Sequence, residues 1–150
     1  MNFNFAFLYL KYYFTAGTKH DVHSPFVYEL VTKVIRNGQT DEIDEIESVR
    51  KKLLHNKSVL NTEVFGARSI NGKRISMPLN RVTRNSSKNK KYCSLLYRIV
   101  KFYQPAVMLE LGTAVGMSAM YIAKGNPAGL LYTIEGSNAI AAIEIGRAHV

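Results

Sequence analysis

Apolar residues recur at helical spacing in two stretches near the N-terminus. The first follows Ser24-Pro25, a pair typical of a helix start, and predicts a helix over residues 25–36. The second begins after Thr40, with acidic residues in its first turn and basic residues toward its end, as the helix dipole favours. The apolar stripe of this second predicted helix consists of Ile43, Ile46, Val49 and Leu53.

The pattern changes between residues 56 and 89, where Asn, Ser, Gly and Lys dominate and the apolar periodicity fades. This composition predicts a long loop or lid with one short helix around residues 77–82. Helical spacing then returns in a stripe that Pro105 closes. That stripe consists of Tyr92, Leu95, Leu96, Ile99 and Tyr103.

The segment 106–137 has the order strand, glycine turn, helix, strand. Residues 106–111 form an apolar run broken only by Glu110, which is typical of a strand buried on both faces of a parallel sheet. Residues 112–116 provide the turn, and residues 130–134 predict the second strand. A strand, a helix and a strand in so few residues imply a right-handed parallel crossover.

These patterns together predict an α/β fold. We expect a helical extension over residues 1–60, a basic loop or lid over residues 61–90, and the start of an α/β domain over residues 91–150. This last part contains the first β-α-β unit of a larger parallel sheet, which the chain holds only in truncated form.

Composition indicates an ordinary globular protein in a reducing compartment. Hydrophobic residues make up 47% of the 150 residues, and Cys93 is the single cysteine. Because Cys93 has apolar neighbours on a predicted helix, we expect it in the core. The apolar run 3–10 is far shorter than the ~20 residues of a membrane-spanning helix and has no signal-peptide features. The sequence therefore predicts a cytoplasmic protein without a membrane partner.

The formal net charge of +9 is concentrated in residues 73–101, called the basic segment below. No acidic residue lies between Lys73 and Leu109. Such a segment attracts polyanions, although no aromatic-and-basic motif of a known nucleic-acid module accompanies it. A solvated surface and a nucleic-acid-binding module both stay open. The cations are Lys73, Arg74, Arg81, Arg84, Lys88, Lys90, Lys91, Arg98 and Lys101.

The glycine turn and the acidic residue after the second strand indicate a nucleotide-type cofactor pocket. In doubly wound sheets ligands bind at the carboxyl ends of strands, where Gly112 and Gly116 let a ligand approach the backbone. Glu135 stands where a carboxylate accepts hydrogen bonds from both ribose hydroxyls. Ala114 and Met117 occupy positions where a pyrophosphate needs glycine, and no Walker lysine follows. S-adenosylmethionine, which carries adenosine without phosphate, fits this pattern better than a dinucleotide.

The motif LELGTAVGMSAMYIA, residues 109–123, resembles motif I of class I S-adenosylmethionine-dependent methyltransferases, particularly the small-molecule O-methyltransferases. YTIEGS, residues 132–137, is similar to the acidic motif after it, and HSPFVYEL, residues 23–30, resembles the helical extension of bacterial members. The resemblance implies an N-terminal fragment of a Rossmann-like methyltransferase. Its activity would be methyl transfer to an unidentified acceptor, an oxygen on a small molecule. A nucleic-acid-binding module, or an RNA methyltransferase, is the alternative, and a dinucleotide oxidoreductase is a weaker one.

By this resemblance, six residues form the S-adenosylmethionine site. Ser118 would face the methionine end from the helix start, and Glu135 would hold the ribose. The methionine end would be lined by Glu110, Gly112, Thr113 and Gly116. The catalytic residues are not assigned. His20, Asp21 and His23 offer no third nitrogen or sulfur ligand nearby, so no metal is expected.

Residues 145–150 are expected to be a non-native tail, because the reverse translation of EIGRAHV resembles a common sequencing adapter. The native sequence would then end near Glu144. We accordingly expect the 150-residue chain to bind S-adenosylmethionine weakly or not at all and to transfer no methyl group.

Overall fold

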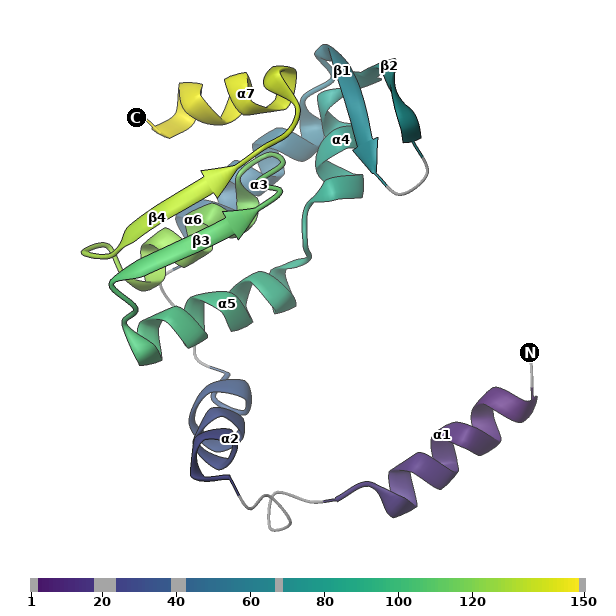
Figure 1. The fold of residues 1–150 in the computed structure, drawn as a ribbon, viewed down its shortest axis with the longest axis vertical. Coiled ribbons are helices and arrows are strands. Elements are labelled where there is room, and N and C mark those ends of the chain that lie inside the picture. Colours follow the sequence, from purple (N-terminus) through teal and green to yellow (C-terminus); the bar gives the residue numbers. More distant parts are fainter. Residues whose placement is uncertain (1–2, 18–23, 39–42, 67–68, 149–150) are drawn as a thin grey trace. The chain divides into compact units, whose positions relative to one another are not determined.

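The computed structural model describes residues 3–17, 24–38, 43–66 and 69–148 and has a mixed α/β architecture (Figure 1). The mixed α/β class predicted from the sequence is therefore confirmed. The chain divides into two units, Met1–Gly38 and Gln39–Val150. Each unit is described by itself.

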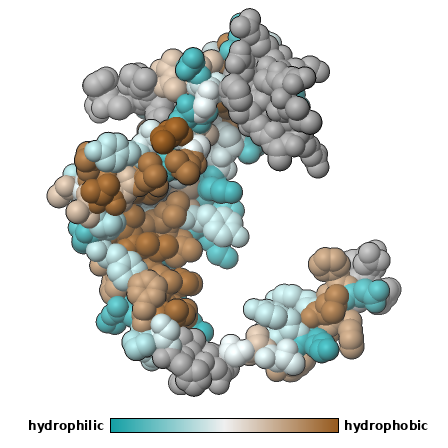
Figure 2. Space-filling model, in the orientation of Figure 1, coloured by the Kyte–Doolittle hydropathy of each residue, from teal (hydrophilic) through white to brown (hydrophobic). Residues whose placement is uncertain are grey.

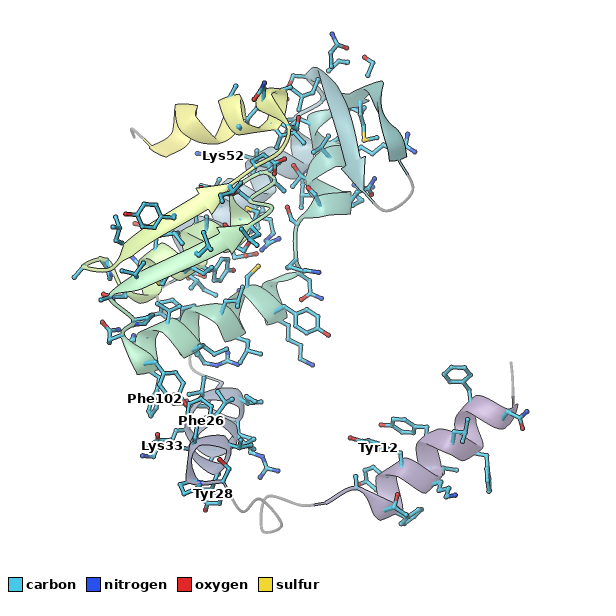
Figure 3. The ribbon with its side chains drawn as sticks, viewed as in Figure 1. Tyr12, Phe26, Tyr28, Lys33, Lys52 and Phe102 are labelled. Carbon is cyan, nitrogen blue, oxygen red and sulfur yellow. The ribbon has the colours of Figure 1, made fainter. Side chains whose placement is uncertain are left out.

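The first unit is helical. It contains α1 (Phe3–Thr15) and α2 (Pro25–Glu29), which continues as a π-helical stretch, η2 (Leu30–Ile35). The Ser24 hydroxyl accepts a hydrogen bond from the Val27 amide at 3.4 Å, so the predicted helix start is confirmed. The aromatic side chains of α1 from Phe5 to Phe14 are exposed, among them Tyr12, which is labelled in Figure 3. No helix in the described ranges is long and apolar enough to cross a membrane.

The second unit combines helices with two small sheets. Helix α3 packs against α4 and α6, so it belongs with the later elements and not with the helices of the predicted extension over residues 1–60. In chain order the elements are α3 (Asp44–His55), β1 (Val59–Gly66), β2 (Ser69–Pro78), α4 (Leu79–Ser86), α5 (Lys90–Tyr103), β3 (Val107–Leu111), α6 (Met117–Gly125), β4 (Leu130–Ile134) and α7 (Asn138–Ala148).

Strands β1 and β2 form an antiparallel hairpin where the sequence pattern predicts a long loop. The loop prediction is wrong over residues 59–78. An antiparallel hairpin can leave one face in water, so a high content of polar residues does not exclude strands. The β-branched and aromatic residues between Val59 and Phe65 favour a strand despite their polar neighbours. The short helix predicted around residues 77–82 is present as the start of α4.

Strands β3 and β4 lie side by side and parallel, connected by α6 (Figure 1). Their register runs from Val107 opposite Leu130 to Leu111 opposite Ile134, which confirms the predicted order strand, helix, strand. Alternate side chains of each strand share one face. The outer face defined in this way carries six exposed apolar residues and is visible in the space-filling view (Figure 2). These residues are Val107, Leu109, Leu111, Leu130, Tyr132 and Ile134.

The hydrophobic core of the second unit joins its helices to the glycine turn. Cys93 on α5 and Tyr121 on α6 are fully buried, so the predicted core position of the cysteine is confirmed. The core cluster consists of Ile43, Ile46, Leu53, Leu79, Val82, Cys93, Tyr97, Val115, Met117 and Tyr121.

A polar cluster crosses this core between α3, α5 and α6. Glu47 Oε1 accepts hydrogen bonds from the Tyr121 hydroxyl and from Arg50 Nε, the latter at 2.9 Å. The same guanidinium contacts Cys93 Sγ at 3.6 Å and donates to the Lys88 carbonyl at 2.8 Å. Burial raises the pKa of Tyr121, and its hydrogen bond to Glu47 raises it further. The cluster therefore holds a neutral phenol, a carboxylate and a guanidinium together inside the unit.

Helices α5 and α6 approach each other closely at Gly125. A Cβ atom there would lie 2.9 Å from both the Tyr97 carbonyl oxygen and Val100 Cβ. We expect Gly125→Ala to lower the free energy of unfolding by about 1–3 kcal/mol, because backbone or core atoms have to move. Gly38→Ala, whose Cβ meets nothing within 4 Å, is the control and should change it by less than about 0.5 kcal/mol. Urea unfolding followed by circular dichroism compares them, and equal stabilities would contradict the tight approach.

Candidate functional site

The turn between β3 and α6 has a backbone conformation that favours glycine at two positions. Gly112 has φ of +84° and Gly116 has φ of +74°, both in the left-handed region. Ala114 between them has φ of 52°, which residues with a Cβ rarely adopt. The amides of Gly112 and Thr113 both donate to the Ile134 carbonyl, at 2.8 and 3.3 Å. The turn is thus fixed to the end of β4.

Glu135, the first residue after β4, fixes the same turn from the other side. Its Oε2 accepts a hydrogen bond from the Ala114 amide at 2.7 Å, and its Oε1 accepts one from the Ser137 amide at 2.9 Å. The carboxylate thereby ties the glycine turn to the start of α7, a role that the sequence pattern did not predict. Each oxygen keeps a further lone pair that a ligand hydroxyl could use.

Two buried polar atoms beside the turn have no hydrogen-bond partner within the described part of the chain. They are Glu110 Oε2 and Thr113 Oγ1, and Thr113 is only 2% exposed. A buried polar group left unsatisfied costs about 1–3 kcal/mol. A ligand that supplies donors here would offset this cost, so these atoms are the part of the turn most suited to bind one.

The Glu110 side chain lies on the inner face of β3. Burial raises the pKa of its carboxyl, and a hydrogen bond with Ser118 of α6 opposes part of that rise. Burial also raises the pKa of the Cys93 thiol, and the negative charge of Glu110 adds to that rise. The carboxylate therefore stands between the first turn of α6 and the core.

The six residues predicted for the cofactor site lie around this one turn. The turn itself contains three of them, Ser118 contacts Glu110, and Glu135 contacts the amide of Ala114 in the middle of the turn. The three in the turn are Gly112, Thr113 and Gly116. Within the described residues no group of three or more His, Cys, Asp or Glu could hold a metal ion. His20, Asp21 and His23 lie outside the described residues.

The basic segment is spread over several elements. Arg81 and Arg84 are exposed on α4, whose opposite side contributes Leu79 and Val82 to the core. Exposed lysines follow in the link to α5 and in its first turn; these are Lys88, Lys90 and Lys91. The side chains of Lys73 and Arg74 lie outside the described ones. Nucleic-acid binding by this segment stays a prediction.

No protein-family model, curated protein or solved structure matches the chain. The evidence for a function therefore comes from the residues of the site and from the resemblance of residues 109–137 to the methyltransferase motifs.

Proposed function

We propose that the turn between β3 and α6 is the S-adenosylmethionine half-site of a class I, Rossmann-like methyltransferase. In this proposal the protein transfers a methyl group to an oxygen of a small-molecule acceptor. The observation that carries this proposal is the unsatisfied pair, Glu110 Oε2 and Thr113 Oγ1, beside a left-handed glycine turn at the carboxyl end of a parallel strand.

The ligand groups of S-adenosylmethionine match the acceptors that surround the turn. Its ammonium group is a donor with positive charge, which suits the Glu110 carboxylate and an adjacent hydroxyl oxygen of Thr113. Its ribose hydroxyls suit the remaining lone pairs of Glu135. These pairings follow the roles that the sequence resemblance implies for the same residues.

The hydrogen bonds of the turn favour this cofactor over a dinucleotide. A pyrophosphate binds to free backbone amides of the glycine turn as well as of the helix start. The amides of Gly112 and Thr113 donate to Ile134, however, and the amide of Ala114 donates to Glu135. The Gly116 amide donates within the turn as well. With four amides in use, the turn offers a phosphate few donors, whereas a ligand rich in donors meets open acceptors.

Methyl transfer from a sulfonium needs mainly proximity and in-line alignment of the acceptor. The half-site contributes to this by fixing the cofactor's methionine and ribose groups relative to two strand ends. No side chain of the described residues is assigned to proton removal from the acceptor.

Binding is tested by titrating the isotopically labelled 150-residue chain with S-adenosylhomocysteine, the unreactive product, in two-dimensional amide NMR. We expect weak, saturable shifts confined to residues 110–118 and to Glu135, since the chain contacts the ligand with one turn and one carboxylate. NAD⁺ at the same concentration is the control and should leave these amides unshifted. Shifts confined to another surface, or equal shifts with NAD⁺, would contradict the half-site.

Thr113→Val should separate ligand affinity from stability. Valine keeps the shape of threonine and removes an unsatisfied hydroxyl, so the free energy of unfolding should stay equal or rise by up to about 1 kcal/mol. The dissociation constant for S-adenosylhomocysteine should rise about 2–10-fold, the loss of one hydrogen bond.

Thr83→Val is the matched control for this variant. Thr83 is equally buried, but its hydroxyl donates to the Leu79 carbonyl at 2.9 Å. This variant should lose about 1 kcal/mol of stability and keep the ligand affinity. If Thr113→Val behaves like Thr83→Val, the Thr113 hydroxyl does not face the ligand.

A further inference from the structure

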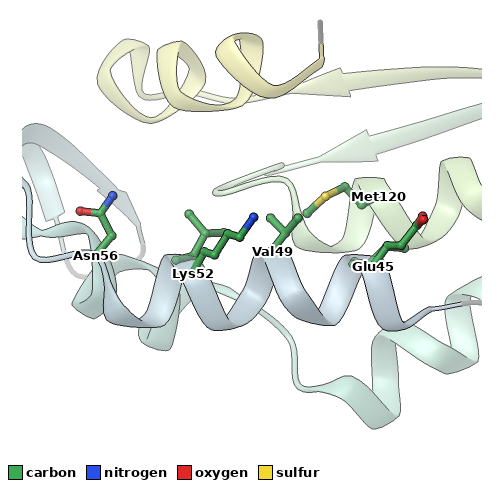
Figure 4. A pocket seen from close by; sticks show the side chains of 7 residues that line it. Glu45, Val49, Lys52, Asn56 and Met120 are labelled. Atoms are coloured by element: carbon green, nitrogen blue, oxygen red, sulfur yellow. The ribbon is translucent and has the colours of Figure 1, made fainter. Parts of the chain in front are cut away.

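A groove of about 540 Å³ lies between α3 and α6 (Figure 4). Its floor consists of four apolar side chains. Ile46 and Leu53 are buried, and Val49 and Met120 are half-buried. The volume lies in the range of small-molecule sites, which combine apolar walls with a few polar groups. The polar residues that line this groove are Glu45, Lys52 and Asn56.

The charged residues that line the groove are Glu45 at one end and Lys52 toward the other. Glu45 at one end has a cation beside it, since Lys124 Nζ lies 3.9 Å from its carboxylate. Asn56 Oδ1 accepts a hydrogen bond from the Ser58 amide at 2.8 Å, which leaves mainly its NH₂ group for a ligand. Lys52 forms no ion pair within the described part of the chain. The Lys52 and Asn56 end therefore offers donors and positive charge.

The position of the Lys52 side chain suits a ligand that lies along α3. In Figure 4 the side chain extends along the groove toward Val49, so its ammonium group stands beside the apolar floor. The stem of a lysine can cover apolar surface while its charged end stays accessible. On the other wall, the unbranched and polarisable side chain of Met120 adapts readily to flat apolar groups.

We propose that this groove binds a small apolar carboxylate, with its hydrocarbon or aromatic body on Val49 and Met120 and its carboxylate at Lys52. The charge complementarity selects an anion, and the apolar floor selects a body without further polar groups. The inference goes beyond the proposed function and does not depend on it, because no residue of the groove belongs to the cofactor half-site.

The probe is 2-naphthoate, and 2-naphthamide is its neutral counterpart of the same shape. The chain has no tryptophan, so naphthalene fluorescence can be excited outside the tyrosine band. We expect one saturable site that binds the anion about 2–5-fold more tightly than the amide, the effect of one partly exposed ion pair. Equal affinities for the two probes would overturn the assignment.

Variants of two adjacent lysines test whether the probe binds in the groove. Lys52→Gln should lower the affinity for 2-naphthoate to that for the amide, whereas Lys52→Arg should retain most of it. Lys51→Gln is the matched control, because Lys51 is exposed on the same helix and does not line the groove. If Lys52→Gln and Lys51→Gln bind the anion equally, Lys52 does not recognise the carboxylate.

Two further variants test the apolar part of the groove. Val49→Trp should fill it and remove binding of both probes, with circular dichroism used to verify folding. Leu109→Thr on the outer face of β3 should leave binding unchanged. Loss of binding in Leu109→Thr, with normal binding in the groove variants, would place the probe on the outer face and overturn the proposal.

Discussion

Replacing Glu47 by alanine is expected to lower the free energy of unfolding of the second unit by about 2–4 kcal/mol. The substitution removes the acceptor that Tyr121 and Arg50 share, and Tyr121 is 0% exposed, so its hydroxyl loses a buried hydrogen bond. The side chains of Arg50 and Glu47 are 12% and 16% exposed, so breaking this largely buried charge pair on one side leaves the other charge poorly compensated. Urea unfolding monitored by circular dichroism measures the loss.

Two variants distinguish the stability contributed by the polar cluster from a general effect of removing a carboxylate. Tyr121→Phe keeps the pair of Glu47 with Arg50 and removes one donor, so it should cost about 1 kcal/mol. Glu45→Ala removes an exposed carboxylate of the same helix turn and should change stability by less than about 0.5 kcal/mol. If Glu47→Ala is no more harmful than Glu45→Ala, the cluster does not hold the helices together.

The same cluster gives stability a dependence on pH. Burial alone would raise the pKa of Glu47, but the hydrogen bonds from Tyr121 and Arg50 outweigh it, and the pKa lies below the ordinary 4.5. The folded state therefore binds the proton less tightly than the unfolded state. Its stabilising contribution is complete above pH 4.5 and is lost as pH falls through the lowered pKa of the folded state. The stabilities of the native chain and of Glu47→Gln should accordingly converge as the solution is acidified.

The elements that the sequence predicts well are those whose apolar pattern is local. The run 106–111 predicts a strand because parallel strands are typically apolar on both faces. Gly112 and Gly116 predict the start of the helix because the turn before it needs a left-handed backbone conformation. The β1–β2 hairpin was not predicted, because an antiparallel strand with polar residues on one face resembles a polar loop in composition.

The contacts that could not be predicted join distant parts of the sequence. Glu47 and Tyr121 are 74 residues apart, and no local pattern indicates that their side chains meet. The residues of the proposed half-site follow from the resemblance to the methyltransferase motifs, but the use of Glu135 as an acceptor for two backbone amides depends on the folded turn. A carboxylate two residues before a helix-capping serine is the one local signal that could have indicated the Ser137 contact.

The outer face of β3 and β4 is unusual for a parallel sheet, whose two faces are normally covered. Its six apolar side chains are between 51% and 73% exposed. They adjoin one another in register, and Leu109 lies opposite Tyr132 at the centre. Helix α7, which follows β4, packs against β1. A contiguous apolar patch of this kind promotes association, and the parallel strands beneath it add edges that can pair with other strands.

We expect the double variant Leu109→Thr, Tyr132→Thr to weaken self-association of the chain at least about tenfold, because each large apolar side chain contributes about 1.5 kcal/mol or more when buried. Threonine retains β-propensity, so the strand pair should persist. Sedimentation velocity over a concentration series measures the association. Val59→Thr, which replaces an exposed apolar residue of β1, is the control and should associate like the native chain.

The midpoint of thermal unfolding shows whether the double variant changes association through this face or destabilises the fold. Leu109 and Tyr132 are more than half exposed in the single chain, so their replacement removes little buried area and should leave the midpoint of dilute protein nearly unchanged. Met108, which precedes Leu109 in β3 and lies on the opposite face of the sheet, is buried, and Met108→Thr should lower the midpoint clearly. Unchanged self-association in the double variant, with Met108→Thr destabilised, would mean that the chains associate through a different surface, because the apolar outer face would then be removed without effect.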